Sequence, residues 1–307
     1  LFLDILKKKG IDVIMVCFPA GEKNKIRSTK EKIEDLLISN NFSRDSLIIA
    51  LGGGVVGDMA GFVASTFMRG IHYLQIPTTL LAMVDSSIGG KTGIDTPHGK
   101  NLIGTFYQPK RIFIDTTFLK TLPKEEMLNG IAEMIKHGIV SDSKFFVFME
   151  EYIEKILSLD SDILIKSIKW SCMIKKIIVE EDEKESLLRK SLNFGHTIGH
   201  AIEKTADYKL KHGEAVALGI LAETRISQEL GLINQIGAEK IYDLIKKAGF
   251  KSSIDKKHIS SIMENTRYDK KNIGGRVKYV LPRKIGKVEI DIEVNEEIIS
   301  KVLGEMN

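Results

Sequence analysis

A run of glycines between an apolar segment and a helical segment is the feature that most constrains the fold of this chain. Gly52, Gly53, Gly54 and Gly57 follow Leu47–Leu51, which is rich in aliphatic residues. Glycines at such a turn let the backbone approach a pyrophosphate, and the amides at the start of the next helix favour an anion. The spacing is not G-x-G-x-x-G, so a tight turn between strand and helix is the alternative interpretation.

Around this run, the first part of the chain alternates short apolar segments with segments of helical periodicity. Short runs rich in Val, Ile and Leu suit strands buried in a parallel sheet. The alternation predicts an α/β, Rossmann-like domain. We predict strands at Ile11–Phe18, Leu47–Leu51, Tyr73–Ile76 and Arg111–Asp115, and helices at Arg27–Asn40 and Met59–Met68.

The pattern changes after Pro123, where long helical stretches follow one another. A small hairpin around Gly286 is predicted from Arg276–Leu281 and Lys287–Ile290. We therefore predict an α/β domain over residues 1–122 and a mainly α-helical domain over residues 123–307. The predicted helices of the second domain are Lys124–Ile139, Lys144–Leu157, Ile163–Glu181, Gly195–Thr205, Gly213–Leu230 and Glu239–Ala248.

The composition is that of a soluble globular protein, with 43% hydrophobic and 28% charged residues. No apolar run approaches the roughly 18 residues that cross a bilayer, so we expect no membrane segment. The net charge of +4 is spread over short lysine clusters, which predicts solvated helix faces and no nucleic-acid partner. A small anionic substrate is compatible with this charge. Cys17 and Cys172 lack CxxC spacing, which indicates free buried thiols in a reducing cytoplasm.

Metal-capable side chains gather on two later segments and one earlier one. His196 and His200 are four residues apart and share a helix face, and His212 follows on the next segment. Glu133 is the candidate carboxylate, and His137 at i,i+4 spacing is a rival ligand. Two imidazoles and one carboxylate make a catalytic metal site, because they leave a coordination position open for a substrate. The remaining histidine could then serve as a general acid–base group.

Lysines flanked by glycines suit the recognition of phosphate or carboxylate. Lys91 follows Gly89-Gly90 in a predicted loop, and Lys100 and Asn101 come shortly after it. The P-loop pattern G-x-x-x-x-G-K-[ST] fails here, which argues against an NTPase. Arg69 adds another potential anion contact, and beside a metal site Lys175, Arg189 and Asn193 would complete a basic pocket for an acidic substrate.

Longer strings carry a resemblance to one enzyme family. They include Leu51-GGGVVGD-Met59, Gln75-IPTTLLAMVDSSIGGKTGID-Thr96, Gly130-IAEMIKHG-Ile139, Leu192-NFGHTIGHAIE-Lys204 and Lys211-HGEAVALG-Ile220. With these strings, spread from about residue 20 to residue 290, the chain resembles the 3-dehydroquinate synthases. Other sugar phosphate cyclases and polyol dehydrogenases, which share the fold, remain rival interpretations, as does an inactive subunit.

The resemblance implies a reaction of the shikimate pathway of aromatic amino acid biosynthesis. 3-Deoxy-D-arabino-heptulosonate 7-phosphate would be converted into 3-dehydroquinate and phosphate by a carbon–oxygen lyase that uses NAD and Zn²⁺ or Co²⁺. A hydroxyl is oxidised by NAD⁺, phosphate leaves by β-elimination, the hydride returns and the ring closes by an internal aldol step. The resemblance also implies a cytoplasmic homodimer.

The resemblance further implies roles for individual residues. Glu133, His196 and His212 would be the metal ligands. The substrate and acid–base residues would be His200, Lys136, Lys91, Asn101, Lys175, Arg189, Asn193, Asp85, Arg69 (from a neighbouring subunit) and one of Lys270 and Lys271, of which we take Lys271.

The NAD contacts implied by the resemblance fall in the first half of the chain. Ala20 stands where the family usually has Asp, which removes one expected contact. Because family members usually begin with a further segment, we expect this chain alone to be less stable and to bind NAD weakly. The NAD contacts would be Glu22, Lys25, Gly54, Val55, Val56, Gly57, Asp58, Thr78, Thr79, Lys91, Lys100, Phe118, Leu119, Lys120 and Thr121.

Overall fold

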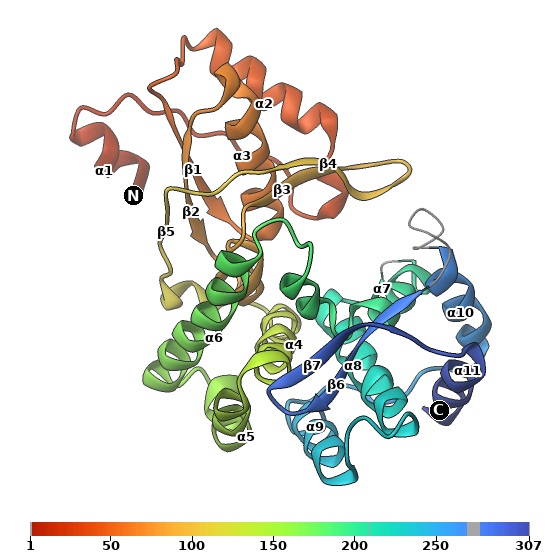
Figure 1. Cartoon of the computed structure of the whole chain (residues 1–307). Coiled ribbons are helices and arrows are strands. Elements are labelled where there is room, and N and C mark those ends of the chain that lie inside the picture. Colours follow the sequence, from red (N-terminus) through yellow and green to blue (C-terminus); the bar gives the residue numbers. More distant parts are fainter. Residues whose placement is uncertain (1, 208, 269–276, 307) are drawn as a thin grey trace. The chain divides into compact units, whose positions relative to one another are not determined.

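The structure is a computed structural model that describes residues 2–207, 209–268 and 277–306. The chain divides into two compact units (Figure 1). The first unit comprises Leu1–Leu51, Val55–Gln75 and Gly90–Arg111, and the second comprises Gly52–Gly54, Ile76–Gly89 and Ile112–Asn307. The boundary expected between residues 122 and 123 stays a prediction.

A three-stranded parallel sheet with helices forms the N-terminal part, as predicted. Its strand order is β1 (Leu47–Gly52), β2 (His72–Pro77) and β5 (Arg111–Ile112). The last strand is shorter than the predicted Arg111–Asp115, because Asp115 instead caps a 3₁₀ turn, accepting the N–H of Thr117. The helices here are α1 (Phe2–Lys8), α2 (Arg27–Ser39) and α3 (Gly54–Thr66).

Helix α3 begins at Gly54, five residues before the predicted Met59. Gly52 therefore ends β1, Gly53 joins the strand to the helix, and Gly54 and Gly57 lie in the first turn of α3. A Cβ on Gly57 would lie 2.6 Å from Gln75 Oε1, and one on Gly54 would lie 2.9 Å from Ser86 Oγ, so a larger residue at either position would displace these side chains. The two interpretations of this run, a pyrophosphate contact and a tight turn, both stay predictions.

The predicted strand at Ile11–Phe18 is wrong, since the segment has no regular secondary structure. Its apolar residues suit a buried strand, but a strand needs a neighbour to pair its backbone groups. None of the strands in the described part of the chain pairs with it. Met15 is consequently 70% exposed and Ile11 49% exposed. Cys17 of the same segment is exposed as well and Cys172 is half-buried, so the prediction of buried thiols is wrong for Cys17.

An antiparallel hairpin replaces the loop predicted around Lys91. It is formed by β3 (Lys91–Thr96) and β4 (Gly99–Phe106), with Ile94 opposite Ile103. Ile94 is 2% exposed and packs in a cluster with Met59 and Phe62 of α3. Only this cross-element burial makes a strand out of a short, glycine-containing sequence.

The second unit is mainly helical, as predicted, and has one large apolar core. The predicted hairpin is confirmed: β6 (Lys278–Lys284) pairs antiparallel with β7 (Lys287–Glu293), and Gly286 adopts φ +86° in the turn. In the described residues, no helix is both long and apolar enough to cross a bilayer. The helices are α4 (Lys124–Ser141), α5 (Ser143–Leu157), α6 (Ser161–Glu181), α7 (His196–Thr205), α8 (His212–Glu229), α9 (Gln235–Lys247), α10 (Ile259–Tyr268) and α11 (Glu296–Glu305).

Short helical turns connect these elements. They are 3₁₀ turns except for one π-helical turn, which carries Asp85. Their bounds are η1 (Glu22–Asn24), η2 (Phe67–Arg69), η3 (Ala82–Ser86), η4 (Thr116–Thr121), η5 (Leu188–Asn193) and η6 (Lys256–His258).

Helices α7 and α8 approach closely because glycines line their contact. A Cβ on Gly219 of α8 would lie 1.9 Å from the carbonyl oxygen of Gly195, and one on Gly199 would lie 3.0 Å from the carbonyl oxygen of Ala215. Gly195 itself adopts φ +78°, which disfavours other residues. The two helices begin at His196 and His212, so this contact sets the positions of two candidate metal ligands (Figure 1).

We predict that Gly219→Ala destabilises the protein by roughly 3 kcal/mol or more, because the new Cβ meets rigid backbone. Gly304→Ala in α11 is the matched control, since a Cβ there meets nothing within 4 Å. The control should stabilise the protein by about 0.5 kcal/mol through helix propensity. Urea unfolding of both variants measures the difference, and equal midpoints would contradict this account of the contact.

Candidate metal and active site

Helix α4 carries the candidate carboxylate ligand on a central, buried turn. The helix follows Pro123 and has Glu125 and Glu126 in its first turn, where carboxylates favour the helix dipole. From residue 129 to residue 140 every position is buried. Glu133 lies in this stretch and is fully buried. A buried carboxylate is costly unless cations, donors or a metal offset its charge.

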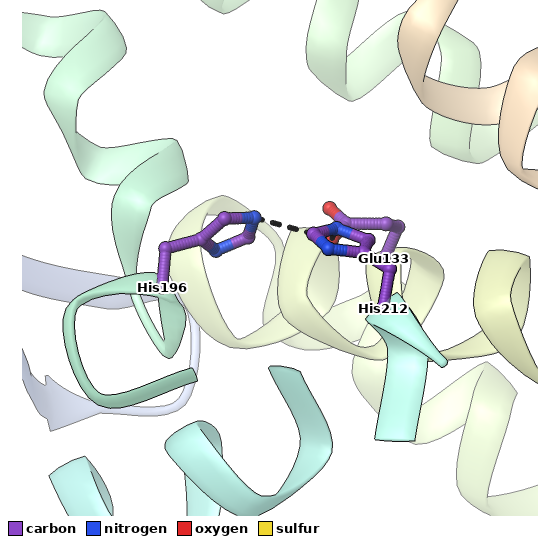
Figure 2. Close-up of side chains that lie close together, drawn as sticks. All are labelled: Glu133, His196 and His212. Carbon is purple, nitrogen blue, oxygen red and sulfur yellow. Dashed lines mark ion pairs between the residues drawn. The ribbon is translucent and has the colours of Figure 1, made fainter. Parts of the chain in front are cut away.

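Two imidazoles face Glu133 from the first residues of α7 and α8 (Figure 2). His196 Nε2 lies 3.5 Å and His212 Nε2 lies 3.6 Å from Glu133 Oε1. The other ring nitrogen of His196, Nδ1, lies 3.2 Å from the carbonyl oxygen of Phe194. That contact suits an Nδ1–H donor and leaves Nε2 as the ligand atom.

The start of α8 is tied to α4 by a second contact. Asn129 Oδ1 accepts the N–H of Gly213 at 2.8 Å, and a Cβ on Gly213 would lie 2.4 Å from the Cα of Asn129. His212 therefore sits next to a junction that only glycine allows. The distance between His212 and Glu133 follows from this close approach of backbones.

The geometry fits a divalent metal of Zn²⁺ type. Ligand atoms about 2.0–2.1 Å from a tetrahedral ion lie about 3.3 Å from one another. The two imidazole nitrogens lie at similar distances from Glu133 Oε1, 3.5 Å for His196 and 3.6 Å for His212. Oε1 of Glu133 is buried and has no hydrogen-bond donor. Glu133, His196 and His212 also form one of three groups in the described chain that could hold a metal ion. The three side chains predicted as ligands are thus brought together, with an orphaned oxygen between them.

The charges around Glu133 keep it ionised. Burial opposes ionisation, but Lys136 and the neighbouring imidazoles outweigh burial and hold the pKa of Glu133 well below its usual value. Lys136 Nζ forms an ion pair with Glu133 Oε2. Burial and then Lys136 lower the pKa of His196 well below its usual range, so this imidazole is neutral and ready to bind a metal.

His212 lies between two carboxylates. Its Nδ1 is 3.5 Å from Glu203 Oε2, opposite the Nε2 that faces Glu133. Burial lowers the pKa of His212, but the carboxylates of Glu133 and Glu203 outweigh burial and raise it to about 9. A carboxylate behind a metal-binding histidine is a common arrangement that fixes the ring. Sequence reasoning missed Glu203, although its place three residues after His200 on the same helix could have revealed it.

The two other candidate ligands fall into separate groups. His200 is grouped with Glu203 and His212, and His137 with Asp85 and Glu133. His137 is fully buried, its Nδ1 lies 2.8 Å from Ser171 Oγ, and its Nε2 lies 4.0 Å from Asp85 Oδ1. Burial, and then Lys136, lower the pKa of His137 to about 3, so it is neutral at physiological pH.

Predicted substrate residues of the second unit are also tied to one another. Lys175 Nζ donates to both the carbonyl oxygen and Oδ1 of Asp85 at 2.6 Å. Burial lowers the pKa of Lys175 although Asp85 opposes this effect. Asn193 donates to Glu185 Oε1 at 2.8 Å, and Arg189 is 2% exposed. These side chains offer cations in a largely buried setting.

The first unit brings together residues for which different roles were predicted. Lys25 is 3% exposed, and its Nζ donates to Asp58 Oδ2 and to Asn101 Oδ1, both at 2.6 Å. It also lies 3.5 Å from Glu22 Oε1. Burial lowers the pKa of Lys25, but Asp58 and Glu22 outweigh burial and raise it. Lys25 therefore links predicted NAD contacts with a predicted substrate contact.

The remaining predicted residues lie in several settings. Lys91 is exposed at the start of β3, and Arg69 is exposed with φ +66°. Thr78 donates its N–H to the carbonyl oxygen of Gly52, and Leu119 is a core residue of the second unit. Lys271 lies outside the described residues. A Cβ built on Gly53 would lie 3.2 Å from Thr79. The NAD contacts of the following residues stay predictions: Val55, Val56, Thr79, Lys100, Phe118, Lys120 and Thr121.

Comparison with known proteins places these residues in a family. A family model described as 3-dehydroquinate synthase N-terminal matches residues 15–129, and one described as 3-dehydroquinate synthase C-terminal matches residues 130–272. The chain is 47% identical to a 3-dehydroquinate synthase of Thermodesulfovibrio yellowstonii over 98% of its own length and 84% of the relative's. It is 49% identical to one of Dictyoglomus turgidum over 95% of its length and 82% of the relative's.

Solved structures of related cyclases share the fold. A 2-epi-5-epi-valiolone synthase of Streptomyces hygroscopicus, with NAD⁺ and Zn²⁺ bound, is 25% identical with a TM-score of 0.92, over 99% of this chain and 85% of that one. A 2-deoxy-scyllo-inosose synthase, complexed with carbaglucose-6-phosphate, NAD⁺ and Co²⁺, is 27% identical with a TM-score of 0.86, over 99% and 86%. The chain thus belongs to the 3-dehydroquinate synthase family.

Proposed function

We propose that this chain catalyses the 3-dehydroquinate synthase reaction, the conversion of 3-deoxy-D-arabino-heptulosonate 7-phosphate into 3-dehydroquinate and phosphate. The observation that carries the proposal is the trio of buried Glu133 with half-buried His196 and His212, which suits an open metal site in a chain of this family. When bound, a divalent ion would acidify a substrate hydroxyl, and NAD would accept a hydride and return it.

The protein groups around the trio suit a substrate that carries a phosphate and a carboxylate. Lys136 and Lys175 supply positive charge next to Glu133 and Asp85, and Arg189 supplies a planar donor for bidentate binding of an anion. Fixed cations in a buried site stabilise charge that develops when phosphate leaves. We assign acid–base chemistry to His200, whose ring centroid lies 5.2 Å from that of His196.

We assign the NAD-contacting role in the first unit to the cluster around Lys25. Asp58 lies near the start of α3, where helix amides favour an anion, and Lys25 neutralises its charge. The solved relatives that hold NAD⁺ support this assignment by their similarity to the chain. The lyase class, the homodimer and the cytoplasmic location are parts of the proposal that rest on family membership.

Turnover of NAD separates this activity from that of a dehydrogenase. We expect release of many phosphates per NAD⁺ from the heptulosonate phosphate, no net NADH, and loss of activity with a chelator. Phosphate release is measured colorimetrically and NADH by its absorbance. Steady NADH accumulation on a polyol would contradict the proposal, as would silence in both assays.

Removing one imidazole should break the metal site. We expect His196→Ala to weaken Zn²⁺ binding by at least about 100-fold. The reason is that replacing a residue that only supports a metal ligand already lowers metal affinity by about 10–100-fold. His72→Ala, which removes an exposed histidine of β2, is the control and should leave Zn²⁺ binding unchanged. Competition with a chromophoric chelator gives both affinities, and equal affinities would rule out the proposed ligand set.

Lys25 should matter for NAD as well as for local order. Lys25→Met leaves Asp58 without its buried cation, and we expect NAD⁺ to bind about tenfold more weakly, the effect of losing a charge-assisted hydrogen bond. Lys23→Met, at an exposed lysine two residues away, is the control and should bind NAD⁺ normally. Isothermal titration measures both, and an unchanged Lys25→Met affinity would place NAD elsewhere.

A further inference from the structure

A buried carboxylate outside the predicted site residues organises the segment between α6 and α7. Asp182 caps the end of α6 and is 8% exposed. Its Oδ1 accepts the backbone N–H of Ser186 at 2.9 Å and the hydroxyl of Ser186 at 3.0 Å. Its Oδ2 accepts the N–H of Leu187 at 2.7 Å and the N–H of Arg189 at 3.0 Å. Four donors thus converge on one carboxylate.

The bonding pattern suits only an ionised side chain. Burial would raise the pKa of Asp182, but the donors from Leu187, Ser186 and Arg189 outweigh burial and hold it below its ordinary value. A carboxylate accepts hydrogen bonds on both oxygens and donates none. An asparagine in its place has a single acceptor oxygen, so it could accept hydrogen bonds from at most one of the two pairs of donors.

The side chain of Arg189 is held from two sides. Its Nη1 donates to the carbonyl oxygen of Glu183, the residue after Asp182, and its Nη2 donates to the carbonyl oxygen of Gly89 at 3.0 Å. Gly89 adopts φ +107°, and a Cβ there would lie 2.3 Å from Arg189 Nη2. The backbone of Arg189 and one of its two carbonyl partners therefore both belong to the turn that Asp182 organises.

We propose that Asp182 is a positioning residue for substrate binding, which fixes the turn over residues 183–189 so that the Arg189 guanidinium is aligned for an anionic group of the sugar phosphate. The inference rests on the proposed function, which gives Arg189 that role. A guanidinium that is already aligned binds a phosphate or carboxylate without a further cost of ordering.

Asp182→Asn tests the inference, since it keeps the shape of the side chain but turns one acceptor oxygen into a donor. We expect KM for the heptulosonate phosphate to rise about tenfold while kcat changes less than about twofold, because ground-state and transition-state binding weaken together. In an Arg189→Lys background the same change should add much less to KM, because both substitutions disable one group.

Asp142→Asn is the matched control. Asp142 also accepts two backbone N–H groups, from Lys144 and Phe145, and the indole N–H of Trp170. It caps α5 and does not organise the Arg189 turn. We expect a loss of Tm similar to that of Asp182→Asn, with KM unchanged. A purely structural role for Asp182 would move KM in both variants or in neither.

The outcomes separate the two claims. A wild-type protein that releases no phosphate overturns the proposed function, and the inference with it. An active wild type with unchanged KM in Asp182→Asn overturns the inference alone. If Asp182→Asn does not fold, Asp182→Glu serves instead: it keeps the charge but displaces the oxygens by one methylene, and the same rise in KM is expected.

Discussion

The charge of Glu133 is the constraint on which the second unit depends. A carboxylate at the centre of a fully buried helix would be expelled or protonated without compensating groups. Here Lys136 lies one turn along α4, and His196 and His212 face the carboxylate from two other helices. The charge of Glu133 is therefore offset by a cation of its own helix and by imidazoles on α7 and α8, so the candidate metal site forms where three helices meet.

The approach of these helices depends on glycines where they touch. Gly195 and Gly219 let α7 and α8 touch, and Gly213 lets α8 meet α4 at Asn129. Gly195 directly precedes His196, and Gly213 directly follows His212. Rigid backbone contacts position a site more closely than flexible side chains do, and a metal site tolerates little misplacement.

Much of this fold could be predicted from sequence, because the helices of the second unit show clear periodicity and the β6–β7 hairpin is marked by Gly286. The exceptions depend on partners distant in the chain. The hairpin of β3 and β4 is stabilised by burial of Ile94 against α3, and Ile11–Phe18 has strand-like residues without a pairing strand. Residue type and spacing indicated a set of candidate metal ligands, from which the family resemblance selected Glu133, His196 and His212. Asp182 was not indicated in this way, because its role arises from backbone N–H groups that any residues could supply.

The most direct test of the account is the zinc K-edge X-ray absorption spectrum of the zinc-loaded protein. We predict two imidazole nitrogens at about 2.0–2.1 Å and a carboxylate oxygen at about 2.0–2.2 Å, with one imidazole fewer in His196→Ala. Sulfur scattering from a cysteine ligand, or an unchanged imidazole count in that variant, would contradict the assignment of Glu133, His196 and His212 as the metal site.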